Sequence, residues 1–307
     1  MGNQLNIPEP QTGLRFCDVH CHIPWTIGAF TGDADESLVP SPAQQVDDFK
    51  AAGGLFLITC SIDLKSAKRC FEFALANESV YFSPGIAPQT VTYTKKKAYA
   101  AEYEQWLDFI ETNGYSDKIV AFGEIGLDFH HAKALGQRER QISELGKILA
   151  FIADKGKPLV LHVRNPGEAD KDTDNPSHPY NKPDAATRQV VTLIDKYGVP
   201  PSQVLFHCYS GPAALNAELV DRGFWFSVPS SSYSFEKWYK ISASLPAERL
   251  MTETDSPFQD PISMEPINTP ANARYALATI ARARNLDQEV ISEMTVENAR
   301  KFFKIVL

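Results

Sequence analysis

Eight short apolar runs recur along this 307-residue chain, and longer stretches with helical character separate them. Runs such as 55–59 (LFLIT) and 158–162 (PLVLH) are continuously apolar, as strands buried on both faces of a parallel sheet are. The eight candidate strands are Leu14–Val19, Gly54–Cys60, Val80–Ile86, Ile119–Phe122, Pro158–Leu161, Gln203–Phe206, Phe224–Val228 and Arg249–Met251. Strand and helix alternating eight times predict an α/β fold, a TIM (β/α)8 barrel.

The stretches between the runs contain amphipathic segments. In residues 143–156 four apolar side chains share one helical face, and Gly156 follows as a stop signal. The four are Leu145, Ile148, Leu149 and Ile152. A doubly wound open sheet is the alternative architecture for the same alternation.

The length suits a single barrel domain over residues 1–307. Two segments lack periodicity, residues 24–41 and an insertion at 166–183, and both follow the carboxyl end of a candidate strand. Active sites of barrels form at that end, so both loops are expected over the catalytic face. The alternative is a solvated loop without function.

The composition excludes several classes of protein. Hydrophobic residues at 43% and charged residues at 22% are ordinary for a globular domain, and no apolar run is long enough to span a bilayer. The net charge of −8 argues against a broad nucleic-acid footprint. Five cysteines without zinc-ribbon spacing favour a reducing cytoplasm, and nothing marks a membrane anchor or an obligate protein partner.

Histidines gather where the candidate strands end. His20 and His22 follow the first run, and they point the same way because side chains alternate along a strand. His162 and His207 end two further runs, whereas His130, His131 and His178 do not end any. Strand ends of a barrel converge on one rim, so the four imidazoles can share metal ions. A buried core histidine explains any one of them, but explains all four poorly.

Two carboxylates end strands as well, Glu124 in AFGEIGLDF and Asp255 in MTETDSP. Divalent cations held by neutral imidazoles favour such anionic ligands. A buried salt bridge is the alternative, but these strand ends lack an obvious set of Arg or Lys partners.

Five sequence motifs resemble those of a known protein family. D-x-H-C-H, G-E-x-G-L-D-F, L-H-V-R, F-H-C-Y-S-G and E-T-D-S-P occur in the order seen in the TatD family of metal-dependent deoxyribonucleases. The tail VISEMTVENARKFFKI is also similar to the closing helix of that family, with Asn298 at the expected place.

The resemblance implies two divalent metal ions, Mg²⁺, Mn²⁺ or Zn²⁺. His20 and His22 would bind one ion with Asp255, Glu124 would bridge, and His162 with His207 would bind the second. Glu253 and Asp128 would support these ligands. Glu124 and Asp255 would be catalytic, with Asp255 orienting the attacking water and taking its proton.

The substrate is less constrained. Arg164, on the same strand face as His162, could bind a phosphate, and Tyr209 could stack on a base. Members usually carry G-I-H-P and R-N-E-P where this chain has Ala87 and Ile267, although Asn268 of the second motif remains as a candidate substrate contact. A histidine and an arginine beside the substrate are therefore missing.

These observations favour a metal-dependent exonuclease that cleaves the phosphodiester bonds of DNA. The first alternative is a small-molecule amidohydrolase, lactonase or phosphoesterase with the same binuclear centre, which the losses at Ala87 and Ile267 favour. The second is a binding module that has kept the barrel without catalysis, although an intact ligand set argues against it.

Overall fold

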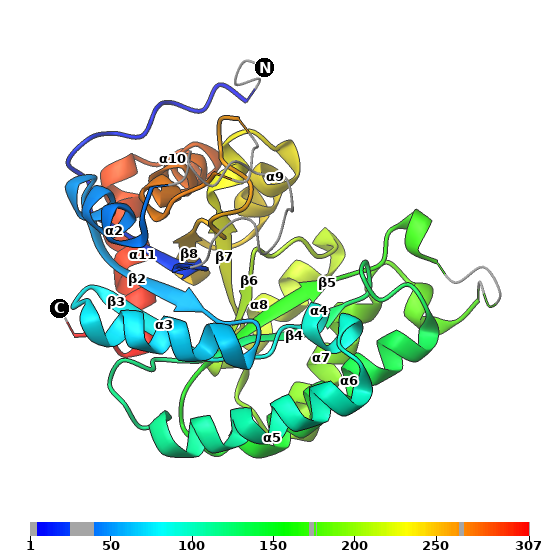
Figure 1. Cartoon of the computed structure of the whole chain (residues 1–307). Coiled ribbons are helices and arrows are strands. Elements are labelled where there is room, and N and C mark those ends of the chain that lie inside the picture. The colour runs from blue at the N-terminus through cyan, green and yellow to red at the C-terminus, as the bar shows by residue number, and fades with distance from the viewer. Residues whose placement is uncertain (1–4, 25–39, 172–174, 176, 264–266, 307) are drawn as a thin grey trace. The chain divides into compact units, whose positions relative to one another are not determined.

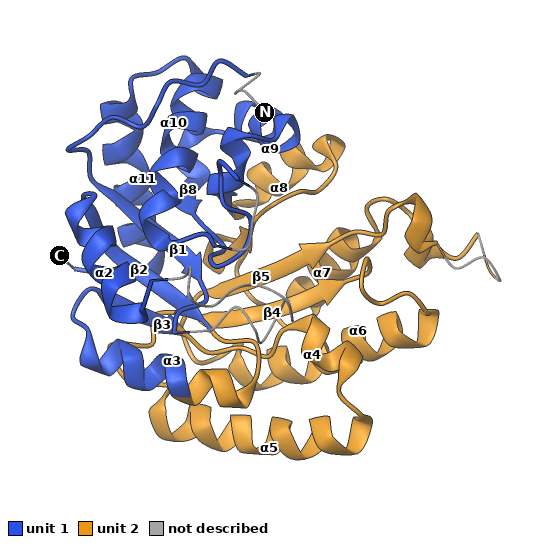
Figure 2. Ribbon diagram, turned by 45° about the horizontal axis from the view of Figure 1, so that its top comes forward, with its two compact units in different colours: residues 1–60, 69–82, 226–307 blue, residues 61–68, 83–225 orange. Residues whose placement is uncertain are grey.

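The computed structural model describes residues 5–24, 40–171, 175, 177–263 and 267–306 (Figure 1). The chain divides into two compact units, which Figure 2 shows in separate colours. Unit 1 comprises residues 1–60, 69–82 and 226–307, and unit 2 comprises residues 61–68 and 83–225.

Unit 1 is built around strands in the order β1-β2-β3, with β1 and β2 parallel. On the other side β1 contacts β8, which pairs in parallel with β7. The strands are β1 (Phe16–Cys21), β2 (Gly54–Cys60), β3 (Val80–Ser83), β7 (Trp225–Pro229, in this unit from residue 226) and β8 (Leu250–Glu253).

The helices of unit 1 are α2 (Pro42–Ala51), α3 (Leu64–Ala76, in this unit from residue 69), α9 (Glu236–Ser244), α10 (Ala273–Arg284) and α11 (Gln288–Phe303), with 3-10 turns η6 (Ser230–Tyr233), η7 (Ala247–Arg249) and η8 (Pro270–Asn272). Helix α2 packs on β2, and α10 packs on β8 and β1. The closing helix α11 packs on β1 and β8. Its Asn298 donates from Nδ2 to the carbonyls of Leu250 and Ala247, at 2.8 and 2.9 Å, and so ties α11 to the start of β8.

Unit 2 contains parallel strands in the order β4-β5-β6. They are β4 (Phe122–Asp128), β5 (Leu159–Arg164) and β6 (Val204–His207). Its helices are α4 (Pro88–Tyr93), α5 (Lys96–Asn113), α6 (Leu135–Ile152), α7 (Ala185–Lys196) and α8 (Asn216–Arg222), with 3-10 turns η2 (Glu168–Asp170), η3 (Pro179–Asn181), η4 (Pro201–Gln203) and η5 (Ala213–Leu215). Helix α6 packs on β4, and α7 packs on β4 and β5. The four apolar side chains predicted on one face of 143–156 are all buried in α6, as expected.

The order of elements and the parallel pairing confirm the α/β, (β/α)8 TIM-barrel-like fold class. The bounds of one strand were wrong: β4 covers Phe122–Asp128 rather than Ile119–Phe122. All seven residues of β4 are buried, but two of them are glycines and two are carboxylates, so the strand does not form a continuous apolar run in the sequence. Gly126 is required there, because its φ is +151° and an added Cβ would lie 1.9 Å from the carbonyl oxygen of His162.

The described part of the insertion at 166–183 contains η2 and η3, and the buried carboxylate of Asp170 anchors it. Asp170 contacts His130 Nδ1 at 2.6 Å and also binds Lys133 Nζ, and both partners belong to the connection between β4 and α6. The guanidinium of Arg138, fully buried in α6, donates to the carbonyls of Asp170 and Tyr180. Burial alone would raise the pKa of Asp170, but the hydrogen bonds from Lys133, the Gly167 N–H and His130 lower it to about 2.

Whether 1–307 is a single folding domain, and whether the 166–183 insertion covers a catalytic face, stay predictions. The first predicted loop, 24–41, lies mostly outside the described residues, which resume at 40. Within the described part of the chain, no helix is both long and apolar enough to cross a membrane.

Candidate metal centre

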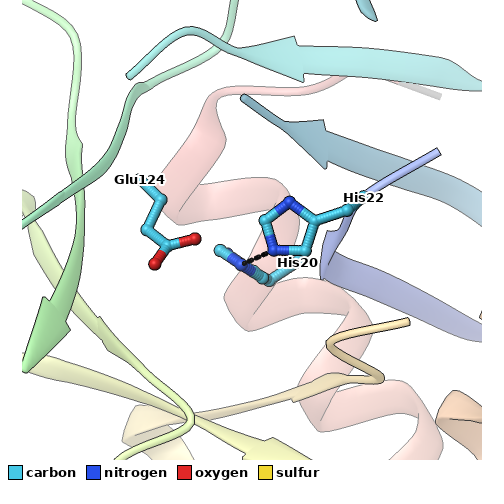
Figure 3. A group of neighbouring side chains, drawn as sticks. All are labelled: His20, His22 and Glu124. Atoms are coloured by element: carbon cyan, nitrogen blue, oxygen red, sulfur yellow. Dashed lines mark hydrogen bonds between the residues drawn. The ribbon is translucent and has the colours of Figure 1, made fainter. Parts of the chain in front are cut away.

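Unit 1 brings together three of the six predicted ligands. His20 lies in β1, His22 follows β1 by one residue, and Asp255 follows β8 by two. The two Nε2 atoms are 3.2 Å apart, and Asp255 Oδ1 lies 3.6 Å from that of His20 and 3.4 Å from that of His22. Figure 3 shows the two rings and the contact between them, drawn with Glu124 of unit 2.

The backbone of unit 1 fixes this geometry. Because β1 and β8 are neighbours, the N–H of Asp255 donates to the carbonyl of His20 at 2.9 Å, and the N–H of His22 donates to that of Ser256 at 2.8 Å. His22 Nδ1 lies 3.0 Å from the carbonyl of Cys60, an oxygen that can only accept. Nδ1 therefore carries a proton, and the lone pair of Nε2 in neutral His22 is directed at His20 and Asp255.

A buried carboxylate supports this cluster from behind. Asp18 accepts hydrogen bonds from the hydroxyl and N–H of Thr254, at 2.5 and 3.0 Å, and from the N–H of His20 at 3.2 Å. Burial raises the pKa of Asp18 well above its usual range, against the effect of these bonds. Asp18 thus joins β1 to the segment that carries Asp255, a role that the sequence alone did not indicate.

Unit 2 brings together the other three predicted ligands. Glu124, His162 and His207 lie in the neighbouring strands β4, β5 and β6, and His162 and His207 are paired in register. His162 Nδ1 lies 2.9 Å from Glu124 Oε1 and 3.3 Å from His207 Nε2. His207 Nε2 lies 3.8 Å from the same Glu124 oxygen. One donor atom from each residue therefore falls within 4.8 Å of the others, close enough to hold one metal ion.

Asp128, at the end of β4, orients the central histidine of this cluster. Its buried Oδ2 lies 3.0 Å from His162 Nε2, and it also accepts from His131 Nδ1 at 2.7 Å and from Gln89 Nε2 at 2.8 Å. A carboxylate that holds one ring nitrogen fixes the tautomer and leaves the other nitrogen for a cation. Here that other nitrogen is His162 Nδ1, which faces Glu124.

The electrostatics of unit 2 favour a positive charge at this point. Burial alone would lower the pKa of His162, but hydrogen bonds to Asp128 and Glu124 raise it to about 10. Burial alone would raise the pKa of Asp128, yet the bonds from His131 and His162 hold it well below its usual range. The field that retains a proton on His162 would equally hold a divalent ion against Nδ1. Imidazole and carboxylate donors also suit Zn²⁺ and Mn²⁺.

The predicted substrate contacts have different surroundings. Arg164 is exposed at the end of β5. The buried hydroxyl of Tyr209 donates to Asn216 Oδ1 at 3.0 Å, and the fully buried Asn268 donates from Nδ2 to the carbonyls of Thr254 and Phe258. These bonds show that Tyr209 and Asn268 support the local fold, and substrate contact by any of the three stays a prediction.

Glu253, expected beside the ligands, ends β8 and accepts a hydrogen bond of 2.6 Å from Ser227 of β7. Gln89 and His131 were not predicted from the sequence as partners of Asp128. His131 was visible only as a histidine outside the strand ends, and Gln89 gave no signal at all.

The parallel strands and their histidine and carboxylate donors define the class of this protein: an α/β barrel with residues at its strand ends that could hold metal ions. The chain belongs to the TatD related DNase family, whose model matches residues 17–304.

Relatives in three groups of organisms are similar to nearly the whole chain. An uncharacterized metal-dependent hydrolase of Methanocaldococcus jannaschii is 27% identical over 292 residues, which cover 95% of this chain and 98% of the relative. The human deoxyribonuclease TATDN3 is 26% identical, with 95% of each chain covered. The 3'-5' ssDNA/RNA exonuclease TatD of Enterobacter lignolyticus is 25% identical over 84% of this chain and 90% of its own length.

Among solved structures, the Escherichia coli TatD homolog YJJV has a TM-score of 0.75 at 21% identity, with 95% of this chain and 99% of that chain covered. At this identity the likeness concerns the fold.

Proposed function

We propose that this chain is a divalent-metal-dependent deoxyribonuclease that removes nucleotides from DNA ends. The observation that carries the proposal is the complete set of six predicted ligands, gathered as three in each unit of a TatD family chain. The names of TATDN3 and of the Enterobacter lignolyticus exonuclease support DNA, and single strands in particular, as the substrate.

The two clusters divide the ligands of a binuclear centre. As proposed, His20, His22 and Asp255 would hold one ion, while His162 and His207 would hold the second and Glu124 would bridge both. The contacts inside each cluster support this division, since Asp255 Oδ1 faces both Nε2 atoms of unit 1 and Glu124 Oε1 faces both histidines of unit 2. Mg²⁺, Mn²⁺ and Zn²⁺ all remain candidates.

Bound divalent ions supply an activated water and neutralise charge on the phosphoryl oxygens. The chain supplies the acceptor for the proton of that water, Asp255, whose side chain is 18% exposed whereas His20 and His22 are buried. Of the three proposed ligands in unit 1, Asp255 is therefore the one with access to solvent. Two divalent ions outweigh the charges of Glu124 and Asp255, so an acidic protein with net charge −8 gains a locally positive centre.

The test uses single-stranded DNA labelled at one end. With added Mn²⁺, Mg²⁺ or Zn²⁺ the purified chain, without any protein partner, should shorten the DNA stepwise, and EDTA should stop the reaction. Glu124→Gln should abolish it, while Glu111→Gln, on an exposed position of α5, serves as the matched control. DNA left intact with every metal would refute the proposal.

A small-molecule amidohydrolase, lactonase or phosphoesterase is the second candidate. Ala87 favours it, because a buried alanine at the start of α4 stands where the family usually has a histidine. A panel of amides, lactones and phosphoesters decides between the two: turnover well above that on DNA selects the second candidate. If the purified protein takes up no metal, the result would instead favour the third hypothesis, a binding module without catalysis.

We also propose a reducing cytoplasm as the compartment. All five cysteines are thiols outside any disulfide, and four of them are buried. Fractionation of cells that express the chain, followed by immunoblotting, tests this proposal, and recovery outside the cytoplasm would contradict it.

A further inference from the structure

Tyr93 is an exposed aromatic residue at the end of α4, and its contacts do not belong to the metal cluster. Its side chain is 66% exposed, so much of the ring is open to solvent. It packs edge-on against the ring of His131, with centroids 6.4 Å apart and an interplanar angle of 80°. Among the described residues, Tyr93 and His131 thus present an aromatic surface in unit 2.

Gln141 of α6 fixes this surface against β4. Its buried amide accepts from the N–H of Asp128 at 2.8 Å, and it donates to Thr92 Oγ1 at 2.7 Å and to the carbonyl of Pro88 at 3.1 Å. One side chain therefore joins the carboxyl end of β4 to both ends of α4. Tyr93, next to Thr92, has a defined position before any ligand binds.

The same surface lies two hydrogen bonds from a predicted metal ligand. His131 Nδ1 and His162 Nε2 both contact the single oxygen Asp128 Oδ2, at 2.7 and 3.0 Å. The side chain of His131 is 36% exposed, and no described residue is hydrogen-bonded to its Nε2. His131 and Tyr93 are thus linked to the unit 2 cluster through Asp128, which contacts the ring nitrogen of His162 opposite the one that faces Glu124.

We propose that Tyr93 and His131 form a subsite for the nucleotide next to the cleaved bond, with its base stacked on Tyr93 and its sugar-phosphate against His131 Nε2. The subsite rests on the proposed function and specifies its substrate as single-stranded or frayed DNA, because a base must leave its own stack to lie on Tyr93. Stacking on an aromatic ring tolerates every base, so exonuclease action would depend little on sequence. His131 also supplies an imidazole in a chain that has Ala87 in place of the usual histidine.

The test compares an ordinary single-stranded oligonucleotide with one that lacks the bases of its two terminal nucleotides at the degraded end. On the ordinary substrate, Tyr93→Ala should raise KM about tenfold and leave kcat unchanged. Tyr93→Phe keeps the ring and should match wild type. So should Tyr115→Ala, whose tyrosine is 81% exposed but precedes β4 at the opposite end of that strand.

On the substrate without terminal bases, wild type and Tyr93→Ala should have the same KM. An unchanged KM for Tyr93→Ala on the ordinary substrate, or an equal rise on both substrates, overturns the subsite.

Two further measurements distinguish failure of the subsite from failure of the proposed deoxyribonuclease function. In the non-cleaving Glu124→Gln background, fluorescence anisotropy of the labelled oligonucleotide should show the same loss of affinity on Tyr93→Ala. His131→Asn keeps a donor for Asp128 but removes the Nε2 edge, so KM should rise while metal content stays at the wild-type level. If wild type cleaves DNA but these variants bind like their parents, only the subsite is wrong; if wild type leaves all DNA intact, the proposed function fails first.

Discussion

Replacing Asp128 with asparagine removes the carboxylate that orients His162 without changing the size of the side chain. Oδ2 of Asp128 accepts from three donors, His162 Nε2, His131 Nδ1 and Gln89 Nε2, and Oδ1 accepts from the backbone N–H of His131 at 2.9 Å. An asparagine has only one acceptor oxygen. In either orientation its NH2 group faces a donor, so part of the network must break.

The size of the effect follows from the place of Asp128 behind a predicted ligand. Loss of a partner that orients a metal-binding histidine costs about 10- to 100-fold in metal affinity, which is about 1.4 to 2.7 kcal/mol. We expect Asp128→Asn to weaken one of two bound ions by this factor and to leave the ion held by His20, His22 and Asp255 nearly unchanged.

The assay is a competition titration of Zn²⁺ or Mn²⁺ against a chromogenic chelator, with circular dichroism to check the fold. Asp170→Asn is the matched control, because Asp170 is an equally buried carboxylate bound to His130 and Lys133 rather than to a metal ligand. Two wild-type affinities in folded Asp128→Asn would refute the assigned role of Asp128.

Three further predictions concern the fold and the metal. Gly126→Ala should destabilise the chain by about 3 kcal/mol or more in urea denaturation, because its Cβ would lie 1.9 Å from the His162 carbonyl oxygen, whereas Gly136→Ala, with open space around it, should be neutral or slightly stabilising. The pKa of Asp170 is held at about 2, below its usual value, so the ionised carboxylate stabilises the fold above about pH 4, and this stabilisation disappears as the pH falls through 2. Asp170→Asn should therefore lower the free energy of unfolding by up to about 2 kcal/mol at pH 7 and by little at pH 2. Equal losses at both pH values would contradict this expectation. EDTA should lower Tm, and re-added Mn²⁺ at about 100 times its Kd should restore about 2.7 kcal/mol of the free energy of unfolding. A Tm that is the same with and without metal would show that neither cluster binds an ion in the native state.

Much of the fold could be predicted because parallel strands buried on both faces leave continuous apolar runs. Seven of the eight expected strands match the observed ones to within a few residues at either end. The strand β4 was misplaced because it is not continuously apolar. Gly123 and Gly126 allow the close approach of β5, and Glu124 and Asp128 are the carboxylates of the candidate metal site. Local propensity fails there because function and close packing override it.

The gathering of the candidate ligands could be predicted because each lies in or just beyond a strand, and neighbouring parallel strands bring such residues into register, as His162 and His207 show. The residues that orient them could not be predicted in the same way. Gln89 and Gln141 act through the packing of α4 and α6 on β4, which depends on tertiary structure rather than on spacing in the sequence. Asn268 has a structural role that its motif did not indicate, since its fully buried amide donates to the carbonyls of Thr254 and Phe258; its contact with substrate stays a prediction.

In the proposed centre, two metal ions held by the clusters of unit 1 and unit 2 would activate the water that hydrolyses DNA. The most direct measurement is the rate of single-stranded DNA hydrolysis by metal-stripped enzyme as Mn²⁺ or Zn²⁺ is added in known ratio to the chain. The proposed centre predicts a rate that rises until two ions per chain are present and then levels off, with no activity at any ratio for Glu124→Gln. Saturation at one ion per chain, or wild-type DNA hydrolysis without metal, would contradict it.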